Sequence, residues 1–153
     1  MKSTLIDYQD YLEAARIPVR LAVAASDGWP VVLSLWFLHQ AGKLYCATQK
    51  TAKVVDYLHS NPKCSFEVAG DQPPYCGIRG RAQAAINGQL GPEMLERLLL
   101  RYVGNTSNEL SQSLLARKQT EVAIVIEPLS IMTWNFSKRM RGIRSVASPS
   151  ICP

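Results

Sequence analysis

Three apolar segments separated by two tight turns constrain the fold of this chain more than any other feature. They cover residues 19–26, 30–38 and 44–48, and Asp27-Gly28 in the first turn is a strong hairpin signal. Tight turns allow only antiparallel pairing of consecutive strands. Apolar residues occupy both faces of the second segment. The pattern predicts an antiparallel meander that is buried on both faces, as in a barrel or a sheet covered on two sides.

The rest of the chain adds helices to further strands. Apolar periodicity predicts helices over 3–15, 51–60, 92–103 and 108–118, and strands over 63–69, 75–86, 120–127 and 130–136. Pro128 is expected to separate the last two strands. Strands in the majority with short connections predict an α+β, mainly β chain built on an antiparallel barrel. We expect one domain over residues 1–140 and a basic, then Ser/Pro-rich tail over 141–153.

Composition narrows the class of protein. Of 153 residues, 47% are hydrophobic and 19% are charged, which is ordinary for a globular domain. The net charge of +5 permits a phosphate-bearing partner, although the basic residues cluster only near the C-terminus. No apolar run approaches the roughly 18 residues that a membrane-spanning helix needs. We therefore expect a cytoplasmic protein without a membrane-spanning segment.

The residues that commonly form metal sites or nucleophilic triads are sparse. The chain contains four cysteines: Cys46, Cys64, Cys76 and Cys152. They lack metal-ligand spacing, and the apolar surroundings of three of them predict reduced thiols and no metal site. The two histidines, His39 and His59, fall at a turn and on a helix, where surface positions are expected. No catalytic residue can be assigned, so an enzymatic activity would depend on a bound cofactor.

The junction between the strand over 44–48 and the helix over 51–60 is the first candidate binding site. Thr51 can cap the helix, and Lys50 and Lys53 flank it. Free backbone N–H groups and the positive end of a helix dipole favour an anion at such a place, whereas lysines there are unfavourable for the helix itself. The pattern indicates either a phosphate site or a plain threonine cap beside two solvated lysines.

Two other groups suit an anionic ligand. Arg79 and Arg81 share one face of a strand, with Gly80 between them, where a strand tolerates glycine poorly unless another surface comes close. Two guanidinium groups on one face can hold a phosphate or a carboxylate. Trp134 precedes a basic segment that contains Arg139, a combination that suits a planar anion. The alternatives are a solvated strand face and core aromatics followed by a solvated tail.

The order and spacing of these segments resemble the FMN-binding split-barrel superfamily, the pyridoxamine 5'-phosphate oxidase-like proteins. The resemblance is carried by residues 20–24, 27–30, 32–37, 43–48, 50–53, 61–62, 78–82 and 133–140. It implies a six- or seven-stranded antiparallel split β-barrel with flanking helices. It also implies a homodimer with two identical flavin sites at the interface.

The resemblance further implies a role for each candidate residue. Four strand residues would lie along the isoalloxazine ring of FMN: Val32, Leu33, Ser34 and Leu35. Four residues around the strand–helix junction would hold the ribityl phosphate: Thr48, Lys50, Thr51 and Lys53. The candidates to reach the cofactor or substrate are Arg79, Arg81, Trp134 and Arg139, the last two from the partner subunit.

The function implied by the resemblance is an FMN-dependent oxidoreductase acting on a small organic substrate. The tail after Met140 does not match the C-terminal substrate-binding segment of the vitamin B6 oxidase. Alternatives on the same fold are a deazaflavin-dependent reductase and a non-catalytic protein that binds flavin or haem. A haem would need an axial ligand, for which His39 and His59 are the only histidines. Nucleic-acid binding through the basic tail is a further alternative, which the modest charge and the strand-embedded aromatics disfavour.

Overall fold

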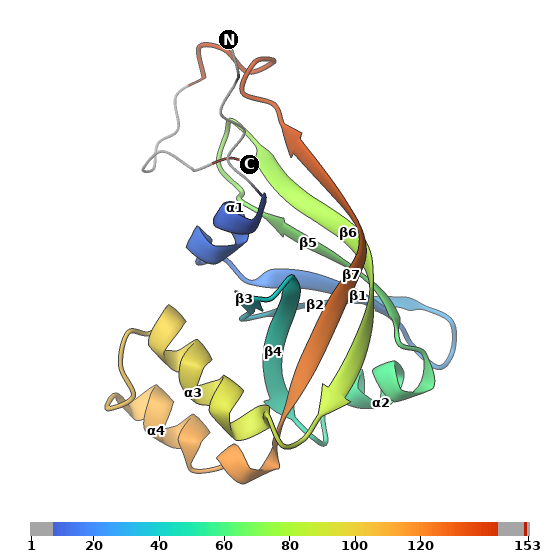
Figure 1. The fold of residues 1–153 in the computed structure, drawn as a ribbon, viewed down its shortest axis with the longest axis vertical. Coiled ribbons are helices and arrows are strands. Elements are labelled where there is room, and N and C mark those ends of the chain that lie inside the picture. Colours follow the sequence, from blue (N-terminus) through green and yellow to red (C-terminus); the bar gives the residue numbers. More distant parts are fainter. Residues whose placement is uncertain (1–7, 144–151, 153) are drawn as a thin grey trace.

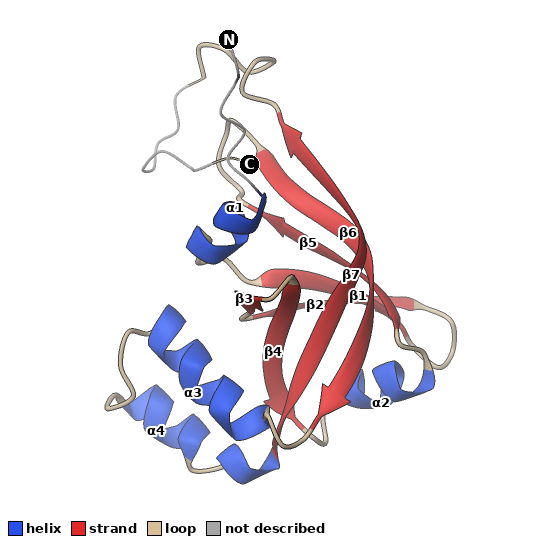
Figure 2. Cartoon of the chain, in the orientation of Figure 1, coloured by secondary structure: helices blue, strands red, loops and turns tan. Residues whose placement is uncertain are grey.

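The computed structural model describes residues 8–143 and 152. Within them, seven antiparallel strands form one sheet in the order β2-β1-β5-β6-β7-β4-β3. The strands are β1 (Val19–Ala24), β2 (Pro30–Leu35), β3 (Leu38–Gln40), β4 (Lys43–Gln49), β5 (Lys63–Ala69), β6 (Cys76–Asn87) and β7 (Glu121–Asn135). The helices are α1 (Tyr8–Ala14), α2 (Lys53–Ser60), α3 (Gly91–Tyr102) and α4 (Glu109–Leu115), with a 3-10 turn, η1, at Lys118–Thr120. The mainly β, α+β architecture expected from the sequence is confirmed (Figures 1 and 2).

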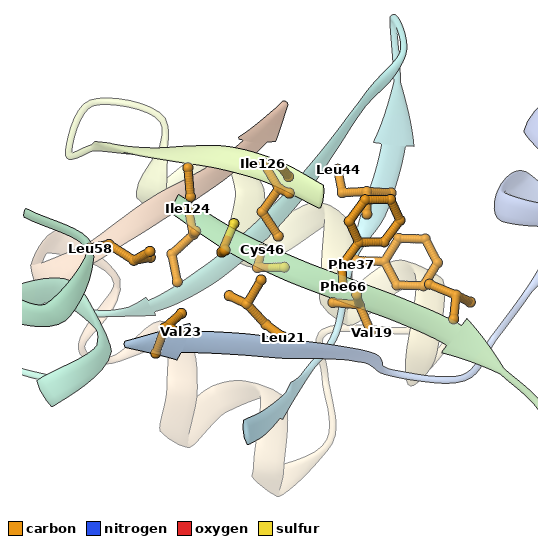
Figure 3. Packing of buried hydrophobic residues seen from close by; sticks show 14 of the residues in the cluster. Val19, Leu21, Val23, Phe37, Leu44, Cys46, Leu58, Phe66, Ile124 and Ile126 are labelled. Atoms are coloured by element: carbon orange, nitrogen blue, oxygen red, sulfur yellow. The ribbon is translucent and has the colours of Figure 1, made fainter. Parts of the chain in front are cut away.

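The sheet is strongly curved, and its strands enclose the main core. Alternate residues of β1, β4, β5 and β7 point inward, among them Leu21, Cys46, Phe66 and Ile124 (Figure 3). Helix α2 covers one end of this core, while α3 lies next to β4 and β7 and α4 lies beside α3 (Figure 1). No helix within residues 8–143 is long and apolar enough to cross a membrane.

The expected strand over 30–38 is divided in two. β2 ends at Leu35, and β3 begins only at Leu38. Phe37 between them is fully buried, and its backbone N–H donates to the hydroxyl of Tyr102 at 3.2 Å instead of to a neighbouring strand. That hydroxyl donates in turn to the carbonyl oxygen of Ile17 at 3.1 Å. The Tyr102 side chain of α3 therefore takes the place of a strand partner for Phe37, where the chain crosses from one edge of the sheet to the other.

β2 is not buried on both faces, contrary to expectation. It is an edge strand that pairs with β1 alone, and no described element covers its outward face. Val32 is consequently 67% exposed, whereas Val31 and Leu33 pack against the core. The even spread of apolar residues along β2 thus reflects one core-facing row and one uncovered row.

β7 continues through Pro128, where an interruption was expected. Arg81 pairs with Ser130 and Ala82 with Pro128, so Leu129 is an extra residue without a partner on β6. This bulge lets the strand accommodate a residue that cannot donate a backbone hydrogen bond. The expected pair of strands over 120–127 and 130–136 is therefore one strand.

The cysteines depart from the expectation of reduced thiols. Cys76 and Cys152 form a disulfide, with a Cα–Cα distance of 5.6 Å and a sequence separation of 76 residues. A pairing over such a separation leaves no local spacing pattern in the sequence. Cys46 and Cys64 are free and buried, as expected. Burial raises the pKa of the Cys64 thiol to about 11, which keeps it protonated at neutral pH.

The start of one expected helix is not described, and another helix begins later than expected. The predicted start of the first helix at Ser3 lies outside the described residues, and α1 is described from Tyr8. α2 begins at Lys53, with Ala52 in the capping position, so Thr51 does not cap it. By contrast, Asn108 caps α4 by accepting a hydrogen bond from the Ser111 N–H at 2.8 Å.

Candidate functional site

A cavity of about 330 Å³ lies where the sheet is split, between β2 and β4. We call it the split cleft. Ser34 and Leu35 line it from β2, and Thr48 lines it from β4. Leu95 and Leu98 of α3 form an apolar wall. The structure therefore brings together three of the candidate residues from two strands that are not hydrogen-bonded neighbours.

Lys50, Thr51 and Lys53 form an exposed turn directly after the Thr48–Gln49 end of the cleft. The Lys50 N–H donates to the Thr120 carbonyl at 2.9 Å, and the Ala52 N–H donates to the Gln49 carbonyl at 2.9 Å, which fixes the turn. Alanine at the capping position has no side-chain acceptor for the first N–H groups of α2. The Val55 N–H donates to the Ala52 carbonyl at 3.0 Å, whereas the N–H groups of Lys53 and Val54 and the two lysine ammonium groups remain available to an anion.

A buried carboxyl group lines the same cleft, and the sequence analysis missed it. The residue Glu121 is only 5% exposed, and its Oε1 accepts a hydrogen bond from Nε2 of Gln49. The hydroxyl of Thr120 donates to Oε1 of Gln49, which orients the amide. Burial raises the pKa of Glu121, partly opposed by the Gln49 hydrogen bond and by the charge of Arg117. Alternation with Ala123 and Val125, which face α3, was the one sequence signal that could have placed Glu121 inside.

Replacing Glu121 by glutamine should make stability less sensitive to pH. Because the folded-state pKa is raised, the folded chain holds this proton more tightly than the unfolded chain, so the contribution to stability is present at low pH and is lost as pH rises through the folded pKa. Glu121→Gln keeps an acceptor for Gln49 and removes the titration. We expect the variant to gain stability relative to the parent chain as pH rises from about 4 to about 8.

Urea unfolding at several pH values measures this difference directly. Glu109→Gln, at an exposed position on α4, is the matched control for the loss of one carboxylate. A difference between Glu121→Gln and the parent that stays constant with pH, or that favours the parent as pH rises, would contradict the prediction.

A second cavity, of about 570 Å³, lies on the outward face of β1, β2, β5, β6 and β7. We call it the outer pocket. Val32, Arg79 and Arg81 all line it, together with Arg20 and Glu67. The structure thus separates these three candidates from Ser34 and Thr48, and assigns them to a cavity of their own within the single chain.

Trp134 lies on the same outward face, next to Arg79 of the outer pocket. The guanidinium of Arg79 is 4.4 Å from the centre of the Trp134 ring, and its Nε is 3.9 Å from Oε2 of Glu67. The ring crosses Gly77, where an added Cβ would come within 2.7 Å of it. Within one chain, Trp134 therefore packs on β6 and does not reach the split cleft.

The last two candidates lie apart from both cavities. Leu33 points inward and packs against the core. Arg139 follows β7, is exposed, and lies 5.1 Å from the Phe136 ring centre. Neither lines the split cleft or the outer pocket.

The histidines do not approach either cavity. The side chain of His39 on β3 is only 4% exposed, which corrects the expected surface position, and its Nδ1 is 3.8 Å from Oε1 of Glu13. His59 is exposed near the end of α2, as expected. Residues 8–143 and 152 contain no group of three or more acidic, cysteine or histidine side chains that could hold a metal ion.

Comparison with known proteins gives similarity in structure alone. No protein-family model matches the chain, and no curated protein sequence matches it. The fold is similar to that of Rv2991, a conserved hypothetical protein from Mycobacterium tuberculosis, with a TM-score of 0.76, 17% identity and coverage of 97% of this chain and 95% of that one. It is similar to an F420 reductase, with a TM-score of 0.70, 23% identity and coverage of 82% and 96%.

A third solved structure connects the fold to the resemblance found in the sequence. It is a proposed pyridoxamine 5'-phosphate oxidase from Listeria innocua, with a TM-score of 0.61, 18% identity and coverage of 80% of this chain and 91% of that one. The seven-stranded antiparallel sheet, split between β2 and β4, agrees with this likeness. The chain therefore has the split-barrel fold of the pyridoxamine 5'-phosphate oxidase-like superfamily.

Proposed function

We propose that the chain binds FMN in the split cleft and serves as a flavin-dependent oxidoreductase. The observation that carries the proposal is the continuity of the cleft with the turn that bears Lys50 and Lys53. Thr48 and Gln49 line the cleft, and the two lysines and the uncapped start of α2 follow directly. A cavity with an apolar wall next to an anion site suits a ring that carries a phosphate.

The residues present fit the chemical groups of FMN. β2 pairs only with β1 in the described sheet, so the outward backbone N–H and C=O groups of this edge strand are available to an isoalloxazine ring beside Ser34 and Leu35. Leu95 and Leu98 would exclude water from one side of the ring. Thr48 and Thr51 would add hydroxyl donors near the phosphate.

The bound flavin would supply transfer of electrons or hydride between a nicotinamide or oxygen and a small organic substrate. The part of this chain would be to position the ring, exclude water and hold its phosphate. Glu121 would present the one acidic group on the cleft wall, at the end nearest Thr48 and Arg117.

A homodimer would complete the site. In one chain the split cleft is open, and the candidates Trp134 and Arg139 lie away from it. Arg139 is exposed after the end of β7 and Trp134 is half-buried near that end, which supports a position in which they cover the cleft of the partner subunit. We assign residues 1–140 to this cofactor-binding domain and 141–153 to a tail, which the disulfide at Cys152 ties to the start of β6.

A deazaflavin-dependent reductase is the second candidate. The likeness to an F420 reductase supports it, as does Arg117 on the cleft wall, because the longer anionic tail of a deazaflavin needs more basic contacts than FMN does.

An absorbance spectrum tests both candidates. The purified protein is mixed with FMN or with the deazaflavin F420, desalted, and compared with a carrier protein treated in the same way. Retention of about one FMN per chain, with shifted flavin bands, is the expected result. Retention of F420 alone would replace FMN by deazaflavin, and a colourless protein after both additions would overturn the cofactor assignment.

A further inference from the structure

The floor of the outer pocket consists of two rows of cross-strand neighbours. In the first row, Arg20 is followed across the sheet by Glu67, Arg79 and Met132. Ser34, which pairs with Arg20, lies outside the pocket. In the second row, Val32 is followed by Ala22, Ser65, Arg81 and Ser130. Side chains directly opposite one another in a sheet lie close enough to act on one ligand.

The two rows differ in how far their charges are satisfied. In the first row, Arg79 pairs with Glu67 at 3.9 Å, and Nη1 of Arg20 donates to the Ala69 carbonyl at 3.2 Å. In the second row, the guanidinium of Arg81 has no ion pair or hydrogen bond to any residue that the structure describes. Three arginines against one glutamate leave the pocket positively charged, with the excess concentrated at Arg81.

Arg81 is flanked by hydroxyl groups. Ser65 lies opposite it on β5 and Ser130 opposite it on β7. The Arg81 backbone N–H donates to Oγ of Ser130 at 3.4 Å, which leaves the hydroxyl proton of Ser130 available for another acceptor. A guanidinium between two hydroxyls is a donor set for a carboxylate or a phosphate.

The remainder of the pocket is apolar and exposed. Val32 is 67% exposed and Met132 is 63% exposed, and both line the cavity. Gly80, between Arg79 and Arg81, leaves no room for a side chain, because an added Cβ would lie 2.1 Å from the Ser130 carbonyl oxygen and 2.8 Å from the Phe66 ring. Exposed apolar side chains around a concave surface are typical of a ligand-binding site.

We propose that the outer pocket binds an organic anion that carries an apolar body. Arg81, Ser65 and Ser130 hold the anionic group, while Val32 and Met132 contact the apolar body. The pocket adjoins the split cleft through Ser34, which lines the cleft and neighbours Arg20 of the pocket. Such an anion would be the substrate of the oxidoreductase. The role as substrate rests on the proposed function, whereas the binding of the anion to the outer pocket does not depend on it.

Isothermal titration of the purified full-length chain with octanoate, octyl phosphate and neutral octanamide tests the proposal. We expect the anions to bind at least about tenfold more tightly than octanamide, since a charge-assisted contact contributes that much. Arg81→Gln should lower the affinity for the anions about tenfold or more and leave that for octanamide unchanged. Arg141→Gln, which removes an exposed arginine after β7, is the matched control and should change neither.

Three results would overturn the proposal: equal affinities for octanoate and octanamide, anion affinity unchanged in Arg81→Gln, or no binding of any of these compounds. Circular dichroism checks that each variant folds. If Arg81→Gln does not fold, Ser65→Ala replaces it and should also weaken anion binding. The preferred anion tells carboxylate from phosphate ligands. A parallel FMN titration separates the two hypotheses, because octanoate binding without FMN binding removes only the substrate role, and FMN binding without octanoate binding removes only the anion site.

Discussion

Replacing Lys50 and Lys53 together by alanine should weaken FMN binding about a hundredfold. Both side chains are exposed at the turn between β4 and α2, next to the uncapped N-terminus of the helix. Each charge-assisted contact to a phosphate contributes about 1.5 kcal/mol, and two contribute about 3 kcal/mol, which corresponds to the expected factor. Neither side chain packs in the core, so the unfolding midpoint in urea should change little. Quenching of flavin fluorescence measures the affinity.

Riboflavin provides the internal control for this experiment, because it carries the same ring without the phosphate. The double variant should bind riboflavin as well as the parent chain does. Lys63→Ala, at an exposed position that begins β5, is the matched surface control and should bind FMN normally. Equal FMN affinity in the double variant and the parent would move the phosphate site away from this turn.

Gly91→Ala should lower the free energy of unfolding by about 3 kcal/mol. Gly91 is the buried first residue of α3, and a Cβ added there would lie 2.0 Å from the carbonyl oxygen of Glu121 and 2.7 Å from the Cα of Val122. These are backbone atoms of β7, so α3 must move away as a unit. Glycine-to-alanine exchange ordinarily stabilises a chain by about 0.4–1 kcal/mol through the unfolded state, and the clash reverses that sign.

Gly88→Ala is the matched control for Gly91→Ala. An added Cβ at Gly88 meets only Cγ1 of Val122, at 4.0 Å, which is an ordinary contact. Its effect in urea unfolding should stay within about 0.5 kcal/mol. The shift of α3 should also displace Leu95 and Leu98 from the wall of the split cleft and weaken FMN binding in Gly91→Ala. Equal stability of the two variants would show that β7 and α3 separate at little cost.

The strands were predictable wherever alternation or a tight turn determined them. The segment over 63–69 matches β5 to the residue, because Lys63, Ser65 and Glu67 alternate with buried Cys64, Phe66 and Val68. The division at Phe37 and the continuation of β7 through Pro128 were not predictable. They depend on a hydrogen bond that the Phe37 N–H donates to Tyr102 of α3 and on a bulge against β6, both of which join residues distant in the sequence.

The sequence suggested which residues belong to candidate sites, but only partly how they are arranged in space. The motif around Lys50 to Lys53 was visible because its residues are consecutive. Arg79 and Arg81 were predicted as one anion-binding group and Trp134 with Arg139 as another, but the place of Arg79, Arg81 and Trp134 on one outward face follows from the pairing of β6 with β5 and β7. Glu121 and Gln49 lie 72 residues apart, and nothing in either local sequence indicates the contact. The capping expectation for Thr51 was wrong because the helix begins two residues later.

The split in the sheet also bears on how the chain avoids edge-to-edge strand pairing with other molecules. β3 covers only the Lys43–Tyr45 part of β4, so the Thr48 end of that strand keeps an unpaired backbone edge, as β2 does on the other side of the cleft. Unpaired edges are templates for strands of other molecules and can start aggregation or domain swapping. Here both edges face one cavity, and a ligand of that cavity would cover them together. Filling the cleft and protecting the chain from edge-to-edge pairing are then the same event.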